Sequence, residues 1–141
     1  MAKFVIELGD WFTDITKHFD LAEKETDPIM KMALWEGANV TANAVNRAAD
    51  RFGVPWHCGI SKHYKKDDGY EVSVGYRNAY YFENRYGNEV AIDLVVNVMN
   101  TGTSRVKGNH FFDNATRSVK GLAEQRMMSK FYQEMNKILG E

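Results

Sequence analysis

Residues 27–55 read DPIMKMALWEGANVTANAVNRAADRFGVP, the longest stretch of uninterrupted helical pattern in the chain. Asp27 suits the N-cap of a helix and Pro28 its first turn, and the glycine and proline near the end of the stretch suit its termination. Between these signals alanine is frequent and small or apolar residues recur at helical spacing. We therefore predict a long helix over Ile29–Phe52.

One face of this predicted helix is lined with small side chains. They are Gly37, Ala38, Thr41, Ala44 and Ala48. Small side chains let another backbone approach closely, so we expect this face to pack tightly against a sheet or a second helix.

The remaining hydrophobic patterns predict short elements followed by a second long helix. Alternation of apolar and polar residues indicates strands, and a period near 3.6 indicates helices. The expected elements are strands at Lys3–Leu8, Tyr70–Tyr76, Ala79–Tyr86 and Glu89–Met99, and helices at Trp11–Lys24 and Phe111–Leu139. Polar composition predicts irregular structure at Val54–Gly69 and a loop at Asn100–Asn109.

This order of elements predicts an α+β fold. We expect a single domain over residues 1–141, in which a long helix in the N-terminal half and a long C-terminal helix pack on a small, mostly antiparallel sheet. Its 141 residues are enough to bury a core.

Composition narrows the class of function. Hydrophobic residues make up 44%, charged residues 26%, and the formal net charge is −1. Such a chain lacks the overall basic charge of a sequence-independent nucleic-acid binder. No apolar run approaches the roughly 20 residues that span a bilayer, and Met1–Asp10 lacks the apolar core of a signal peptide. We therefore expect no membrane association. Because Cys58 is the single cysteine, we also expect no intramolecular disulfide.

His57, Cys58 and His63 are the nearest approach to a metal-binding or nucleophilic cluster. A structural zinc site needs about four ligands, and a Cys–His nucleophile needs an accompanying oxyanion hole. Neither requirement is met by the neighbouring sequence, where Asp67 and Asp68 are the closest carboxylates. We expect a non-enzymatic protein with no catalytic, metal-binding or cofactor-binding residues.

A short basic segment offers an alternative function. Lys62, Lys65 and Lys66 flank Tyr64 and could form a nucleic-acid patch, although two aspartates follow directly. A solvated loop explains these residues equally well. A small nucleic-acid-binding regulator is therefore the alternative from a different class of protein.

Aromatic side chains are concentrated in one part of the chain. Aromatic residues make up 13% of the sequence, and the densest run contains Tyr76, Tyr80, Tyr81, Phe82 and Tyr86. These rings could stack on bases, but tyrosine is enriched at protein interfaces. We predict that this run contributes to a protein–protein interface.

The segment before the last helix, residues 100–115, reads NTGTSRVKGNHFFDNA. It resembles the tail-completion (neck) family of head–tail connector proteins of long-tailed bacteriophages. That family carries Glu, an aromatic residue and Gly-Thr-Ser-Arg, followed by a His-Pro-Phe start to its C-terminal helix. The positions that match in register are Gly102, Thr103, Ser104, Arg105, Phe111 and Ala115. The chain departs from the pattern at four positions, Asn100, Thr101, Asn109 and His110, which stand in place of the Glu, the aromatic, the His and the Pro.

The resemblance implies a structural protein of the virion neck, assembled in the host bacterial cytoplasm. Its expected partners are further copies of itself in a homo-oligomeric ring, head-completion or portal-side proteins, and tail-tube proteins, with DNA at most passing through the ring lumen. It implies no cofactor and no catalytic residue. A tail terminator or another tail connector is the closely related alternative.

The matching residues also have physical roles that do not depend on the family. Gly102 supplies a turn at positive φ, Thr103 and Ser104 can bond nearby backbone groups, and Asn109 suits the N-cap of the last helix. Arg105 is then expected to point outward, where its guanidinium could donate hydrogen bonds to a carboxylate of a neighbouring molecule or to solvent. We predict that residues 102–105 and the aromatic run together form the interface.

Overall fold

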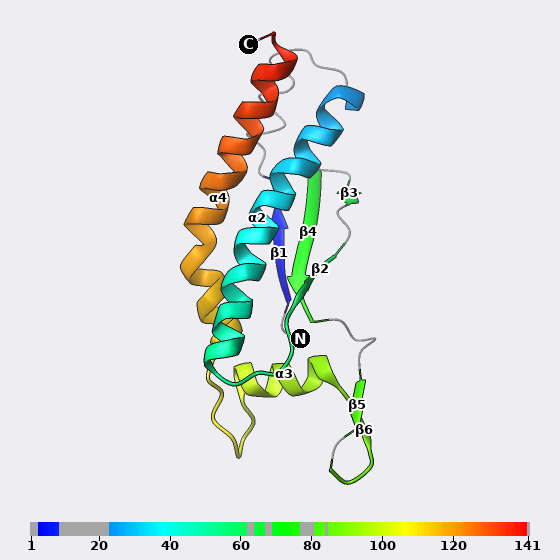
Figure 1. Cartoon of the computed structure of the whole chain (residues 1–141), viewed down its shortest axis with the longest axis vertical. Helices are drawn as coiled ribbons and strands as arrows, with labels where there is room; N and C mark the ends of the chain where they lie inside the picture. Colours follow the sequence, from blue (N-terminus) through cyan, green and yellow to red (C-terminus); the bar gives the residue numbers. More distant parts are fainter. Residues whose placement is uncertain are drawn as a thin grey trace.

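The computed structural model describes residues 3–8, 23–61, 64–66, 69–76, 81–83 and 85–140. Within these ranges it forms helices α2, α3 and α4, an antiparallel sheet built around one central strand, and a separate two-stranded ribbon (Figure 1). The elements are β1 (Lys3–Glu7), α2 (Glu23–Arg51), β2 (Gly59–Ile60), β3 (Tyr64–Lys66), β4 (Gly69–Gly75), β5 (Tyr81–Glu83), β6 (Glu89–Ala91), α3 (Ile92–Thr101) and α4 (Phe111–Ile138). The predicted α+β class is confirmed.

Strand β4 is the centre of the main sheet. Strand β1 pairs antiparallel along one edge, with Phe4 opposite Val74 and Ile6 opposite Val72. The backbone N–H of Leu8 extends this pairing by donating to the carbonyl of Tyr70 at 3.2 Å. The predicted strands at Lys3–Leu8 and Tyr70–Tyr76 are therefore confirmed.

The other edge of β4 is covered by two short strands. In β2, Ile60 lies opposite Val74, and in β3, Tyr64 lies opposite Glu71. The prediction of wholly irregular structure across Val54–Gly69 is wrong here. Hydropathy missed these strands because pairing with the open edge of β4 satisfies backbone groups and needs no alternating side-chain pattern.

Helices α2 and α4 lie side by side and antiparallel beside the sheet (Figure 1). The small-residue face of α2 allows their close approach, as predicted. A Cβ atom built on Gly37 would lie only 2.7 Å from the Met127 sulfur, and the Thr41 hydroxyl folds back to donate to the Gly37 carbonyl at 2.9 Å. The predicted C-terminal helix is confirmed in α4.

The core lies between these two helices and the sheet. Its largest fully buried side chains include Leu34 and Val45 of α2, Val72 and Val74 of β4, and Phe111, Phe131 and Met135 of α4. Glu134 is the acidic residue nearest to this core on α4, and it is held by Lys137 at 3.0 Å and Lys130 at 3.3 Å. Because Val72 and Val74 are among these buried side chains, the alternating apolar face predicted for β4 points inward.

Helix α2 begins earlier than the local signals predicted. The expected N-cap, Asp27, lies inside the helix, and its carboxylate accepts a hydrogen bond from the hydroxyl of Tyr70 on β4. Pro28 is also inside. The preceding residues, Glu23–Glu25, are good helix formers. The proline removes one i→i−4 hydrogen bond, and the helix continues through it.

The strand predicted at Glu89–Met99 is wrong beyond its first three residues. Only β6 is extended, and α3 follows directly. The face that α3 buries consists of Asp93, Val96 and Asn100, of which two are polar, while Leu94 is 58% exposed. The alternation of apolar residues in this segment therefore does not mark the face that is buried.

Among the described residues, the predicted strand at Ala79–Tyr86 corresponds to the shorter β5. It does not join the main sheet but pairs with β6 in the two-stranded ribbon. Most of the helix predicted at Trp11–Lys24 lies outside the described residues, and its last two residues belong to α2.

Candidate assembly surface

The segment between α3 and α4 forms a closed turn, which we call the Gly-Thr-Ser-Arg loop (residues 102–108). It begins at Gly102, whose φ of +83° confirms the predicted positive φ. Gly102 and Lys107 form an antiparallel bridge, and the N–H of Thr103 donates to the carbonyl of Val106 at 2.7 Å. The loop is therefore a hydrogen-bonded hairpin and not an open connection.

The base of the Gly-Thr-Ser-Arg loop has no room for side chains. A Cβ atom on Gly102 would lie 2.5 Å from the Val106 carbonyl oxygen, and one on Gly108 would lie 2.4 Å from the Asn100 carbonyl oxygen. These neighbours are backbone atoms, which cannot move aside as a flexible side chain can. Glycine is thus required at both ends of the loop by contact as well as by φ at Gly102.

Thr103 shapes the tip of the loop. Its hydroxyl oxygen accepts hydrogen bonds from the backbone N–H groups of Arg105 at 3.2 Å and Val106 at 3.1 Å. This confirms the predicted role of Thr103. Ser104 is exposed and makes no comparable bond within the described part of the chain.

Asn100 ties the loop to the first turn of α4. Its side chain is 2% exposed, and its Oδ1 accepts the N–H groups of Phe112 at 3.1 Å and Asp113 at 3.2 Å. Asn109 was predicted as the N-cap, but that position is taken by His110, which has a φ of +55° and no side-chain capping bond. Asn109 instead accepts the N–H of Phe111 at 3.0 Å. The capping oxygen comes from α3, which local sequence signals could not indicate.

The side chains at the tip point to solvent. Thr103, Ser104, Arg105, Val106 and Lys107 are all exposed, and Val106 is 55% exposed despite being apolar. A cation and an aliphatic side chain are therefore presented on a backbone that is already fixed. Such preorganisation lowers the entropy lost when a partner binds.

The aromatic run does not act as one surface. Tyr76 is buried, its hydroxyl donates to the Trp56 carbonyl at 3.0 Å, and its ring centroid lies 6.4 Å from that of Phe112. The structure thus places Tyr76 in the core. Tyr86, by contrast, is 72% exposed in the turn between β5 and β6.

The other aromatic candidates are less fully described. Tyr81 and Phe82 lie in β5, and Tyr80 lies outside the described residues. Near Tyr86, the guanidinium of Arg85 lies 4.9 Å from the ring centroid. This cation–π contact gives the exposed turn a defined arrangement.

His57 and Cys58, the described members of the cluster considered for metal binding, do not form a metal site with other described residues. Cys58 is buried, its N–H donates to Asn46 Oδ1 at 2.8 Å, and burial raises the pKa of its thiol to about 12. His57 Nε2 lies 2.8 Å from Asp50 Oδ1 on the surface. No group of three or more potential ligands occurs among the described residues, which do not include His63. The side chains of the basic segment Lys62–Lys66 also lie outside the described part.

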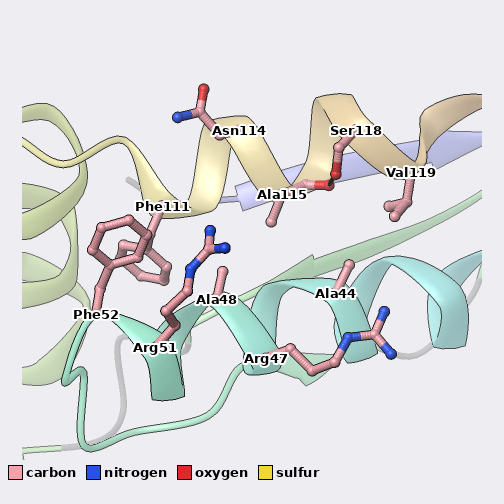
Figure 2. Close-up of a pocket in the computed structure, with 10 residues that line it drawn as sticks. All are labelled: Ala44, Arg47, Ala48, Arg51, Phe52, Phe111, Asn114, Ala115, Ser118 and Val119. Carbon is pink, nitrogen blue, oxygen red and sulfur yellow. Dashed lines mark hydrogen bonds between the residues drawn. The ribbon is translucent and has the colours of Figure 1, made fainter.

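A groove between α2 and α4 was not predicted from the sequence. It has a volume of about 570 Å³, and its wall carries Arg47 and Arg51 beside small and aromatic residues (Figure 2). The signal that could have found it is the pair of arginines one helical turn apart on an alanine-rich helix that is followed directly by Phe52.

Comparisons with protein-family models, curated proteins and solved structures give no match. Across the described residues, none of the helices is both long enough and apolar enough to cross a membrane.

Proposed function

We propose that this protein is a structural component of the head–tail junction of a tailed bacteriophage. In this proposal it forms a homo-oligomeric ring that joins portal-side or head-completion proteins to the tail tube. The proposal is supported by the resemblance of residues 100–115 to tail-completion proteins and by the geometry of those residues.

The observation that carries the proposal is the construction of the Gly-Thr-Ser-Arg loop. Gly102 and Thr103 match the family pattern, and they are also the residues whose conformation and hydrogen bonds build the turn. The two further matches in the turn, Ser104 and Arg105, are exposed, and the Arg105 guanidinium is available to a carboxylate of a neighbouring subunit. A rigid turn with an outward arginine suits assembly.

Exposed aromatic side chains on the two long helices support an assembly role. Trp35 on α2 is 49% exposed, and Tyr132 on α4 is 47% exposed. Large aromatic residues are enriched at protein interfaces. A subunit in a closed ring needs at least two contact surfaces, and Trp35 and Tyr132 lie on elements other than the loop.

Native mass spectrometry and negative-stain electron microscopy of the purified protein test the proposal. We expect a ring of one stoichiometry for the natural protein and loss of that ring for Arg105→Ala, with thermal unfolding unchanged. Lys107→Ala is the matched control, since it removes a neighbouring exposed cation that is not part of the motif. A monomer that binds DNA in a strongly salt-dependent way would favour the nucleic-acid regulator instead.

A further inference from the structure

The β5–β6 ribbon stands apart from the body of the protein. Its strands pair only over Tyr81–Glu83 and Glu89–Ala91, and Figure 1 shows it projecting beyond the end of α3, away from α2 and α4. An isolated two-stranded ribbon is marginally stable in water. A contact from outside the body would therefore add to its stability.

The tip of this ribbon carries two carboxylates and the cation Arg85 around an aromatic ring. Glu83 and Glu89 are both exposed and lie directly opposite each other in the ladder. Like charges at such positions, with Cβ atoms about 5 Å apart, destabilise the pairing. The Glu83 carboxylate lies over the turn, because a Cβ on Gly87 would be 3.7 Å from its Oε1. Tyr86 lies in the turn that joins the two strands.

The α2–α4 groove has the complementary chemistry. Ala44, Ala48 and Ala115 line it, and Phe52 and Phe111 lie together at one end (Figure 2). Phe52 is 43% exposed, so an apolar surface is open to solvent there. These apolar residues form the floor of the groove, where an apolar or aromatic side chain of a partner could pack.

Two arginines border this floor without a counter-charge. Arg47 and Arg51 are exposed, and within the described residues neither has a carboxylate at ion-pair distance. The Arg51 guanidinium lies 5.1 Å from the centroid of the Phe52 ring and reaches between the helices in Figure 2. Residues four apart on a helix have Cβ atoms about 5–6 Å apart.

The two surfaces match in charge, in spacing and in apolar content. The Cβ atoms of the opposed glutamates are about 5 Å apart, and those of the two arginines are about 5–6 Å apart. We infer that the β5–β6 ribbon of one copy docks in the α2–α4 groove of the next, with Glu83 and Glu89 on Arg47 and Arg51 and with Tyr86 on the apolar floor. The inference rests on the proposed ring function and adds a subunit contact to the one proposed for Arg105.

The contact would be head-to-tail. The ribbon and the groove are different surfaces, and the ribbon points away from the helices that form the groove. Contacts between unlike surfaces generate a ring when the rotation closes. Each subunit would give its ribbon to one neighbour and its groove to the other.

Charge reversal tests this contact. We expect Arg47→Glu/Arg51→Glu to abolish rings in native mass spectrometry, and Glu83→Arg/Glu89→Arg to do the same. The chain that carries all four changes should form rings again, because the charges are exchanged between the two surfaces. Lys120→Glu/Arg126→Glu is the control, since it reverses two exposed cations of α4 that do not line the groove.

A cross-link reports the contact even when rings are unstable. A copy with Tyr86→Cys is mixed with a copy with Ser118→Cys, a groove residue, and treated with a short bismaleimide. Ser118 is replaced by Gln125→Cys in the control mixture, because Gln125 is exposed elsewhere on α4. We expect a heterodimer cross-link with Ser118→Cys only, and its loss when the arginines are reversed.

The possible outcomes separate the contact from the proposed function. Rings that persist in both reversed variants would overturn the contact and leave the ring function standing. If the natural protein forms no rings and the Tyr86→Cys and Ser118→Cys copies do not cross-link, both the contact and the ring function are overturned. A charge-dependent cross-link without closed rings would support the contact and count against the ring.

Discussion

Replacing Asn100 by alanine tests how the Gly-Thr-Ser-Arg loop and α4 are held together. The Asn100 side chain is buried, and its Oδ1 is the acceptor for two N–H groups in the first turn of α4, those of Phe112 and Asp113. Alanine removes the acceptor and leaves both donors at a site shielded from water. We expect a large loss of stability from a change of one polar side chain.

The size of the loss follows from these two bonds. A typical hydrogen bond contributes about 1 kcal/mol, and removal of a helix cap costs about 0.5–2 kcal/mol. The penalty for burying an unpaired donor adds to this, so we expect Asn100→Ala to cost about 2–3 kcal/mol. For a chain of 141 residues this corresponds to a fall in Tm of roughly 6–10 °C.

Urea unfolding followed by circular dichroism measures the effect, with two controls. Asn109→Ala removes one bond, to Phe111, from a half-buried side chain and should cost about 1 kcal/mol or less. Asn100→Asp keeps an acceptor oxygen at a helix N-terminus, so it should retain most of the stability. A loss below about 0.5 kcal/mol for Asn100→Ala, the range of ordinary surface changes, would refute the reasoning.

Three further predictions concern the pH dependence, the helix packing and the thiol. Burial, with a hydrogen bond and like charge from Glu7, raises the pKa of the Glu71 carboxyl above 4.5, so stability falls as pH rises through that pKa. Glu71→Gln should therefore stabilise the fold at neutral pH, with no gain below about pH 4.5, in urea titrations across pH. Hydrogen bonds from Lys137 and Lys130 lower the pKa of Glu134, so Glu134→Gln should destabilise at neutral pH and lose this effect as pH falls through the lowered pKa; matching slopes for the two variants would contradict both assignments. Gly37→Leu should cost about 1–3 kcal/mol by overpacking against Met127, and Met127→Ala should restore part of it in thermal unfolding; an unchanged Tm for Gly37→Leu would contradict the close packing. Cys58, buried with a pKa of about 12, should react with a thiol reagent only after unfolding, and rapid labelling of the native protein would show that its burial is misjudged.

Much of the fold could be predicted from the sequence because its main elements are marked locally. Alanine-rich periodicity and glycine punctuation identify the long helix, and alternation from Tyr70 to Tyr76 identifies the central strand. Glu89–Met99 could not be resolved because α3 buries Asp93 and Asn100 beside Val96, so its inward face is polar. The short strands β2 and β3 depend on pairing with β4, which no local pattern contains.

The candidate site could be predicted only in part. The turn at Gly102 and the bonds of Thr103 follow from residue types, whereas the capping of α4 by Asn100 depends on a contact across 12 positions. Tyr76 and Tyr86 are the same residue type in the same aromatic run, and only the tertiary structure shows that the first ring is buried and the second exposed. The groove with Arg47 and Arg51 exists because α4 packs beside α2, a relation between segments that lie far apart in the sequence.

The most direct test of the proposed function is to disrupt the gene, which the proposal assigns to a phage or prophage, and to image the particles by electron microscopy. We expect DNA-filled heads and separate, unattached tails, with attachment restored by the natural gene and not by Arg105→Ala. Complete virions with tails attached at normal frequency in the disrupted strain would contradict a role at the head–tail junction.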